Sequence, residues 1–292
     1  MFKGSLVALV TPMQIDGRID YDRFRDLVEW HVQSGTDAIV AVGTTGESAT
    51  LSDEEFEEVV TTCVDVAAGR CPVIAGTGSN NTQHAIALSK IALRAGAQAG
   101  LSVVPYYNKP TQAGLIAHFS TIADATELPL ILYNVPARTV TDMQPETVAR
   151  LMEHPNIIGI KEATGDVGRL LALKSLGVEG CLLSGDDVTA CEFMRQGGDG
   201  VISVTANVVP DKMARLCALA AESKWEEAEQ LNEELLPLHR ALFVSSNPMP
   251  VKWALAQMGK IDSGIRLPLV PLNDTEAEPL RVALQQLGLI DA

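Results

Sequence analysis

The sequence predicts a parallel (β/α)8 barrel of the TIM type with a C-terminal helical extension, on three observations. Short apolar segments alternate with amphipathic segments about eight times over roughly 225 residues, without a break in composition. Each apolar segment ends in a loop marked by Gly or Pro, as expected for parallel strands joined by right-handed crossovers. The rest of the chain carries only helical patterns. We therefore expect a barrel over residues 1–224 and a helical extension over 225–292.

The expected elements follow from residue periodicity and turn signals. Strands are predicted at 6–10, 38–42, 72–75, 99–104, 130–134, 156–161, 180–183 and 200–204. The first helix spans 21–35, and the second opens with a capping box of Ser52 and Glu55. Thr111 caps a later helix, and Pro145 lies in the first turn of another. The extension is expected to contain helices over 225–243, 250–259 and 276–288.

Composition excludes several classes of function. The 22 Lys and Arg stand against 37 Asp and Glu, and a net charge of -15 argues against nucleic-acid and anionic-membrane partners. The five cysteines show no Cys-x-x-Cys pair, which is typical of free thiols in a reducing cytosol. The five histidines have no metal-ligand spacing, so no metal is expected. The apolar run at 6–10 is too short for a signal peptide or a membrane span, and we expect a cytoplasmic protein.

Lys161 is the most informative residue in this pattern. It ends the apolar run at 156–161, where a buried strand has no structural use for an ammonium group. Burial would lower its pKa and give a partly neutral amine, which is a nucleophile toward carbonyl groups. For a lone lysine at a strand end, a side chain that reaches solvent is the better explanation. The chemical interpretation gains weight from Tyr133, near the end of the neighbouring strand.

A barrel would gather further polar side chains with these two, because the C-terminal ends of its strands share one mouth. Thr44 and Thr45 follow the second strand, Tyr107 the fourth, and Arg138 lies in the loop after the fifth. One amine, several hydroxyls and a guanidinium suit carbonyl chemistry on a carboxylate substrate. Singly, each has an ordinary structural explanation: a core tyrosine, a surface ion pair, a plain turn or interface packing. The sequence has no Ser–His–Asp set, Walker-type phosphate loop or complete Gly-x-Gly-x-x-Gly, and no cofactor is expected.

At these residues the chain resembles the pyruvate-dependent class I aldolases typified by 4-hydroxy-tetrahydrodipicolinate synthase. The motifs that carry the resemblance are Gly43-Thr44-Thr45-Gly46-Glu47, Tyr133-Asn134-Val135-Pro136-Ala137-Arg138-Thr139, Gly159-Ile160-Lys161-Glu162-Ala163-Thr164, Leu182-Leu183-Ser184-Gly185-Asp186-Asp187 and Asn247-Pro248-Met249-Pro250-Val251-Lys252. They occur in the family's order over the full length.

The resemblance implies that Lys161 forms an imine with pyruvate, which then condenses with L-aspartate 4-semialdehyde. Pyruvate's carboxylate would bind the Thr44–Thr45 loop, and Tyr133 would move protons at the imine carbon and oxygen. Thr44 and Tyr107 would complete a hydroxyl relay, with no histidine or carboxylate placed for acid–base work. Arg138 would bind the semialdehyde carboxylate.

Two further backbone contacts with pyruvate and an oligomeric state are also implied by the resemblance. Gly185 and Ile202 match positions that touch pyruvate through backbone atoms. Tyr107 matches a tyrosine that enters a neighbouring subunit's site, so the active unit would be at least a dimer. A homotetramer, built as a dimer of dimers, is the expected assembly.

Two alternatives remain open. N-acetylneuraminate lyase and the 2-keto-3-deoxy sugar acid aldolases share the lysine and the tyrosine, but they lack an arginine matching Arg138. A non-catalytic regulator on the same scaffold would be expected to have lost Lys161 or Tyr133, and both are present.

The resemblance also implies a degenerate regulatory pocket for L-lysine. The matching positions are Ser48, Ala49, Phe56, Asn80, His84 and Tyr106. Strongly regulated bacterial members have a histidine in place of Phe56 and a glutamate in place of His84. Phe56 offers no hydrogen bond and His84 supplies no carboxylate for an ammonium group, so weak or absent feedback inhibition is expected.

Overall fold

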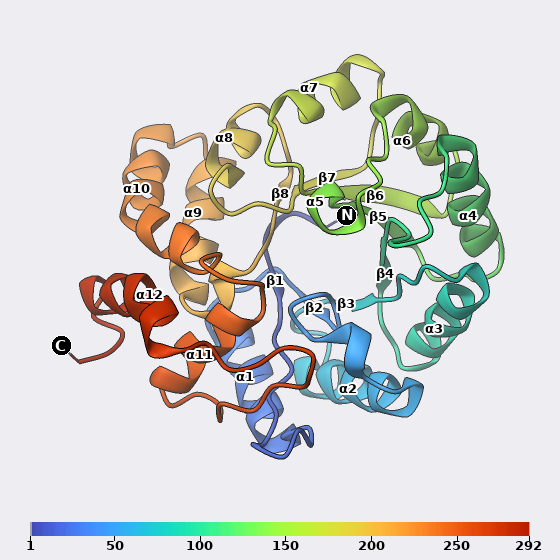
Figure 1. Ribbon diagram of the computed structural model, residues 1–292. Coiled ribbons are helices and arrows are strands. Elements are labelled where there is room, and N and C mark those ends of the chain that lie inside the picture. The colour runs from blue at the N-terminus through green and yellow to red at the C-terminus, as the bar shows by residue number, and fades with distance from the viewer. Residues whose placement is uncertain (1, 292) are drawn as a thin grey trace.

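The computed structural model, which describes residues 2–291, is a closed barrel of eight parallel strands (Figure 1). The predicted (β/α)8 fold is confirmed. The strands are β1 Gly4–Ala8, β2 Ala38–Ala41, β3 Val73–Gly76, β4 Ala99–Val103, β5 Leu130–Asn134, β6 Ile157–Glu162, β7 Cys181–Ser184 and β8 Gly200–Ser203. Each strand pairs with its sequence neighbour, and β8 pairs with β1 to close the ring.

Helices surround this ring. They are α1 Tyr21–Gln33, α2 Asp53–Ala67, α3 Thr82–Arg94, α4 Gln112–Asp124, α5 Pro136–Thr139, α6 Pro145–Met152, α7 Gly168–Ser175, α8 Ala190–Arg195 and α9 Pro210–Ala221, with short 3-10 turns η1 Ser48–Thr50 and η2 Thr205–Asn207. The predicted caps are present: Ser52 and Glu55 form the capping box of α2, and the Thr111 side chain accepts from the amide of Gly114.

Three more helices follow the barrel: α10 Trp225–Ala241, α11 Met249–Gln257 and α12 Asp274–Gln286. Their ends lie within two residues of the predicted ones. α10 packs on α9 and α12, and α11 contacts both α12 and η2, so these helices lie along one side of the barrel (Figure 1). Positions 1 and 292, the outer ends of the two predicted segments, lie outside the described residues.

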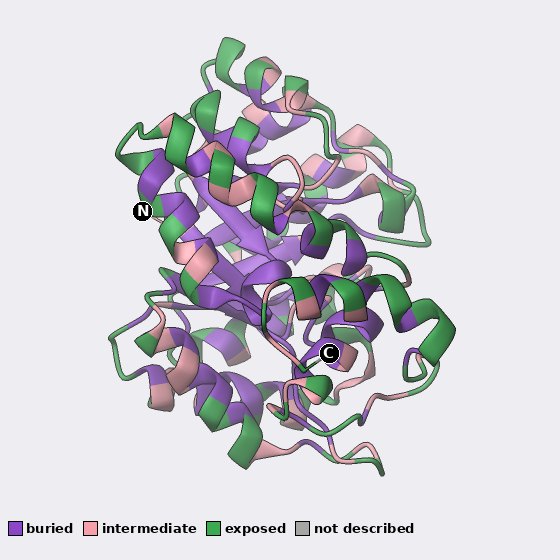
Figure 2. Cartoon of the chain, turned by 90° about the vertical axis from the view of Figure 1, so that its left-hand side faces the viewer, coloured by how far each residue is buried: buried purple, intermediate pink, exposed green. Residues whose placement is uncertain are grey.

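Apolar side chains fill the barrel and the layer between barrel and helices. The interior of the ring holds Leu6, Val40, Ile74, Ile131, Leu183 and Ile202, among others. The strands are buried along nearly their whole length, while the helices alternate buried and exposed faces (Figure 2). Since burying apolar area contributes about 25 cal/mol per Å², this two-layer core fixes the positions of the strand ends.

Two local predictions were wrong in detail. β6 continues one residue beyond Lys161 to Glu162, and Tyr133 and Lys161 are register partners on adjacent strands. Arg138 lies not in a loop but in the one-turn helix α5, which Pro136 begins. A proline at the first helical position favours this turn because its φ is already helical.

The ends of β2 and β3 approach each other unusually closely. A Cβ built on Gly76 would come within 2.1 Å of the Val42 carbonyl oxygen, so only glycine fits there. Val42 itself has φ +54, which is strained for a β-branched residue. This strained, close-packed backbone leads directly into the Thr44–Thr45 loop.

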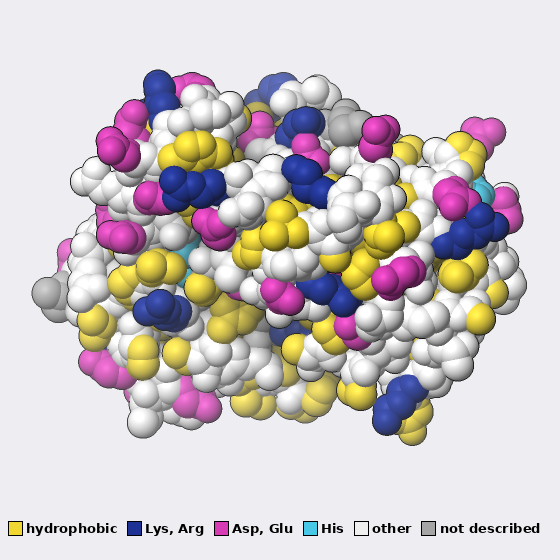
Figure 3. Space-filling view, turned by 90° about the horizontal axis from the view of Figure 1, so that it is seen from above, with side chains coloured by type: hydrophobic (Ala, Val, Ile, Leu, Met, Phe, Trp, Pro, Cys, Tyr) yellow, Lys and Arg dark blue, Asp and Glu magenta, His cyan; other side chains and the backbone are white. Residues whose placement is uncertain are grey.

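The surface mixes both charge signs. On the face shown in Figure 3, basic and acidic side chains are interspersed among apolar ones. Within residues 2–291 no helix is both long and apolar enough to span a membrane.

The five cysteines (Cys63, Cys71, Cys181, Cys191 and Cys217) are free thiols, as expected from their spacing, and all five are buried. No group of three or more His, Cys, Asp or Glu residues that could hold a metal ion occurs in the described part of the chain.

Candidate active site

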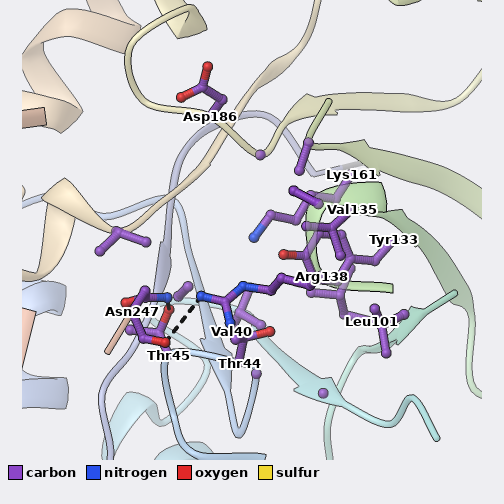
Figure 4. A pocket seen from close by; sticks show the side chains of 18 of the residues that line it. Val40, Thr44, Thr45, Leu101, Tyr133, Val135, Arg138, Lys161, Asp186 and Asn247 are labelled. Carbon is purple, nitrogen blue, oxygen red and sulfur yellow. Dashed lines mark hydrogen bonds between the residues drawn. The ribbon is translucent and has the colours of Figure 1, made fainter. Parts of the chain in front are cut away.

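A cavity of about 840 Å³ lies at the C-terminal ends of the barrel strands. It contains most of the predicted site: Thr44, Thr45, Tyr133, Arg138, Lys161 and Gly185. In Figure 4, Lys161, Tyr133 and Arg138 extend into one space, and Thr45 and Asn247 lie across from them. The hydrophobic strands therefore deliver an amine, a phenol, two hydroxyls and a guanidinium to one place, as predicted.

Lys161 is buried, with 6% of its surface exposed. Burial lowers the pKa of its amine to about 8; the Arg138 charge acts in the same direction and Asp187 opposes it. Roughly a tenth of the amine is then neutral at pH 7. Its Nζ lies 4.5 Å from the centroid of the Tyr133 ring. Lys161 thus combines a nucleophilic fraction with direct access to the cavity.

Tyr133 is also buried, at the end of β5. Burial raises the pKa of its phenol, while the Arg138 charge and the Thr44 hydroxyl act in the opposite direction. The phenol therefore carries its proton at neutral pH, beside the lysine amine. A neutral phenol can donate a proton to a reacting oxygen and accept one later.

Asn247 connects two parts of the site, and sequence reasoning gave it no role. Its side-chain Nδ2 donates to Thr45 Oγ1 at 3.0 Å, and its carbonyl accepts from Arg138 Nη2 at 3.1 Å (Figure 4). Its Oδ1 is buried and has no hydrogen-bond partner among the described residues. Asn247 therefore orients both the threonine loop and the guanidinium. The signal available in the sequence was its place in the Asn247–Lys252 motif.

A buried ion pair between Glu47 and Lys252 anchors the loop that carries Thr44 and Thr45. Glu47 has φ +58, and its carboxylate pairs with the ammonium of Lys252 on α11. Lys252 Nζ also donates to the Thr11 carbonyl at 3.1 Å, and the Arg266 amide donates to Glu47 at 3.1 Å. Both side chains of the pair are almost wholly buried, so solvent barely screens it.

Gly185 is required by sterics. A Cβ built there would lie 2.9 Å from Lys161 Cε and 2.5 Å from Ala163 Cβ. The glycine lets its backbone run against the lysine side chain, within the cavity lining.

Ile202 and Tyr107 are not among the residues that line the cavity. Ile202 is 1% exposed and packs in the barrel interior on β8. Tyr107 has φ +73 and is 90% exposed on the surface. The proposed contacts of both residues stay predictions.

The sequence analysis expected no histidine or carboxylate to be placed for acid–base work, and the structure brings one of each close to the lysine. His239 on α10 lines the cavity, and its Nδ1 lies 2.8 Å from Thr205 Oγ1. Burial lowers the pKa of His239, which favours its neutral form, while Asp187 and Asp186 oppose that shift. Asp187 is likewise buried and acts electrostatically on Lys161. Local patterns could not reveal these groups, because they come from distant elements.

A second cavity, of about 500 Å³, lies beside the first and contains most of the predicted regulatory positions. Ser48, Ala49, Phe56, His84 and Tyr106 line it, and Asn80 does not. Asn80 instead donates its Nδ2 to the Tyr106 carbonyl at 3.3 Å.

In the second cavity, the His84 ring contacts a carboxylate. Its Nε2 lies 2.9 Å from Asp53 Oδ1, and Asp53 also lines the cavity. The second cavity therefore contains the Asp53 carboxylate, which the sequence analysis did not include. His84 already contacts this carboxylate.

Comparisons with known proteins agree with this geometry. A family model described as "Dihydrodipicolinate synthetase family" matches residues 1–287. The chain is similar to 4-hydroxy-tetrahydrodipicolinate synthase of Alcanivorax borkumensis, with 56% identity over 292 residues that cover 100% of this chain and 99% of the relative. It is 57% identical over 291 residues to the protein of that name from Stutzerimonas stutzeri, covering 99% and 100%.

A solved structure is also close to this fold. The crystal structure of dihydrodipicolinate synthase from Acinetobacter baumannii complexed with pyruvate has a TM-score of 0.97 and 54% sequence identity, covering 99% of this chain and 100% of that one. With the sequence matches, this shows that the chain belongs to the dihydrodipicolinate synthetase family.

Proposed function

We propose that this protein condenses pyruvate with L-aspartate 4-semialdehyde to (4S)-4-hydroxy-2,3,4,5-tetrahydro-(2S)-dipicolinate, the committed step of diaminopimelate and L-lysine biosynthesis. The observation that carries the proposal is the buried Lys161 amine, with a pKa lowered to about 8, beside the Tyr133 phenol. The family membership and the names of the relatives support it.

The first step is imine formation. Pyruvate's carboxylate binds the backbone amides and the Thr45 hydroxyl of the Thr44–Thr45 loop. Asn247 and the Glu47–Lys252 ion pair hold this loop in place. The neutral Lys161 amine attacks the keto carbon, and the resulting carbinolamine loses water. Tyr133 donates the proton that lets the oxygen leave as water.

The imine then acts as an electron sink. Removal of a proton from the former methyl group gives an enamine, whose carbon attacks the aldehyde of the second substrate. Arg138 binds the carboxylate of that substrate by a charge-assisted contact, which places the aldehyde for attack. Attack of the substrate amine on the imine carbon closes the ring and releases Lys161.

Proton exchange with solvent involves a neighbouring subunit in this proposal. Thr44 lines the cavity, whereas Tyr107 projects from the surface, where it is free to enter a neighbour's site. We place the active enzyme in a homotetramer, arranged as a dimer of dimers, in the cytoplasm.

Reductive trapping tests the covalent step. Borohydride reduction in the presence of pyruvate is expected to give a mass increase that peptide mapping assigns to Lys161. Lys161→Ala is expected to abolish this adduct, whereas Lys90→Ala, at an exposed helical lysine, is expected to leave it unchanged. An adduct mapped to another lysine would refute the assignment.

A further inference from the structure

Asp187 is a buried carboxylate that the mechanism above does not use. It is 2% exposed and lies between β7 and α8. Its Oδ2 accepts from the amides of Val204 and Thr205, at 2.9 and 3.0 Å. Its Oδ1 is buried and has no hydrogen-bond partner in the described part of the chain. Two amide donors stabilise a negative charge on this group, and one oxygen is left free.

The segment that carries Asp187 runs against Lys161. Lys161 pairs with Leu183 in the β6–β7 register, and the Gly185 amide donates to the Glu162 carbonyl at 2.7 Å. At Gly185 the backbone is so close that an added Cβ would lie 2.9 Å from Lys161 Cε. Asp187 follows two residues later, so its charge is fixed on the β7–β8 side of the lysine.

We propose that Asp187 is the fixed counter-charge of the covalent intermediate on Lys161, which rests on the proposed Schiff-base function. Overall, the Lys161 ammonium and the pyruvate carbonyl give a protonated imine and one water. The positive charge therefore stays on the same buried nitrogen. A positive charge in a poorly solvated cavity is costly unless a fixed negative charge lies near it. Asp187 supplies that charge without a direct hydrogen bond, so it does not block the nucleophile.

The ionisable groups that line the cavity do not supply a negative charge directed at the Lys161 nitrogen. Arg138 adds positive charge, and Tyr133 and His239 are held in neutral forms by burial. Asp186 is half-buried, and its side chain points away from Lys161 (Figure 4). The titratable or charged residues that line the cavity with Lys161 are Tyr133 from β5, Arg138 from α5, Asp186 from the segment after β7, and His239 and Arg240 from α10. Asp187 is not among the lining residues but acts electrostatically on Lys161.

His239 on α10 supports the position of the Asp187 carboxylate through Thr205. Its Nδ1 contacts Thr205 Oγ1 at 2.8 Å, and the amide of Thr205 is one of the two donors to Asp187. The helix after the barrel is thereby tied to the donor that holds the carboxylate. His239 is a positioning residue in this arrangement.

Asp187→Asn tests the proposal, because asparagine keeps an acceptor for the two amides and removes only the charge. The measurement is the pH dependence of borohydride-trapped pyruvate adduct, together with kcat and KM. Loss of a nearby negative charge lowers the lysine pKa, so the acid limb is expected to move to lower pH by about one unit. kcat is expected to fall on the order of tenfold, because the imine cation loses its counter-charge, while KM for pyruvate changes little.

Two further variants separate charge from fold. Asp199→Asn is the matched control. In the wild type, Asp199 Oδ2 accepts from the Leu182 amide at 3.0 Å at the opposite end of β7. The Asp199→Asn variant is expected to keep the acid limb of adduct formation at the wild-type pH. Asp187→Ser leaves room for a water on the two amides and serves as a second neutral variant, with the same shift expected.

An unchanged acid limb and kcat in a folded neutral variant would overturn the proposal, as would an equal shift in Asp199→Asn. The wild-type adduct separates this failure from failure of the proposed function. If the wild type forms no adduct at Lys161, the proposed function fails. If only the expected shift is missing, the role of Asp187 alone fails.

Discussion

Replacing Lys252 by methionine is expected to destabilise the fold and loosen the pyruvate-binding loop together. The side chains of Lys252 and Glu47 are 3% and 2% exposed, so the substitution leaves a carboxylate in a place that water does not reach. Glu47 would keep one donor, the amide of Arg266, and the Thr11 carbonyl would lose its ammonium partner.

The size of the effect follows from this burial. Removing one partner of a buried ion pair costs about 3–5 kcal/mol, mainly because the remaining charge is uncompensated. At about 2–4 °C per kcal/mol for large domains, the melting temperature is expected to fall by roughly 6–20 °C. Solvent screening, which reduces the worth of exposed pairs, applies little here.

A double-mutant cycle measures the pair itself. Lys252→Met, Glu47→Gln and the double variant are compared by thermal unfolding and by KM for pyruvate. The double variant is expected to recover more than half of the stability lost in Lys252→Met, since no buried charge remains. KM is expected to rise in Lys252→Met, because Glu47 belongs to the loop that carries Thr44 and Thr45.

The reasoning would be refuted by a Lys252→Met protein that melts within about 2 °C of the wild type, or by a double variant less stable than Lys252→Met. The first result would mean that the carboxylate finds water or takes up a proton cheaply. The second would mean that the side chains matter for their shapes more than for their charges.

Arg138→Ala is expected to impair use of aspartate semialdehyde by about 10- to 100-fold in kcat/KM while adduct formation with pyruvate persists; equal loss of both would make Arg138 structural. Mixed dimers of Tyr107→Phe and Lys161→Ala chains are expected to regain activity if Tyr107 acts in a neighbouring site, and verified mixed dimers without rescue would exclude sharing. L-lysine is expected to inhibit weakly or not at all, because Phe56 cannot hydrogen-bond and the Asp53 carboxylate is already paired with His84. Each missing charge-assisted contact costs roughly 1.5–3 kcal/mol of binding free energy. Inhibition of initial rates by L-lysine below about 1 mM would contradict this expectation.

The sequence allowed the barrel to be predicted, and with it the position of most of the proposed site residues at the cavity, because both follow from local pattern. The spacing of apolar runs places the strands, and a strand's end places Lys161 and Tyr133 at the mouth. Prediction was less accurate at strand and helix limits. Arg138 looked like a loop residue because a single helical turn is too short to show a period.

The parts that could not be predicted depend on contacts between distant residues. Asn247 bonds Thr45 across 202 positions, and Lys252 pairs with Glu47 across 205. No window of sequence contains both partners. The one available clue was chemical: Lys252 is the one charged residue in a mostly apolar helix, as Lys161 is in the mostly apolar segment 156–161. The same reasoning applied to the helix would have marked Lys252 as a buried, paired charge.

The ion pair between Glu47 and Lys252 also sets when the enzyme can first work. The threonine loop leaves the ribosome early, but its anchors on α11 and at Arg266 are made 205 and 219 residues after Glu47. A growing chain that has already formed most of its strands still lacks the lysine that neutralises Glu47. Substrate capture is therefore expected only once Lys252 and Arg266 have been made, and products truncated before them, however well their strands pair, are not expected to sequester pyruvate.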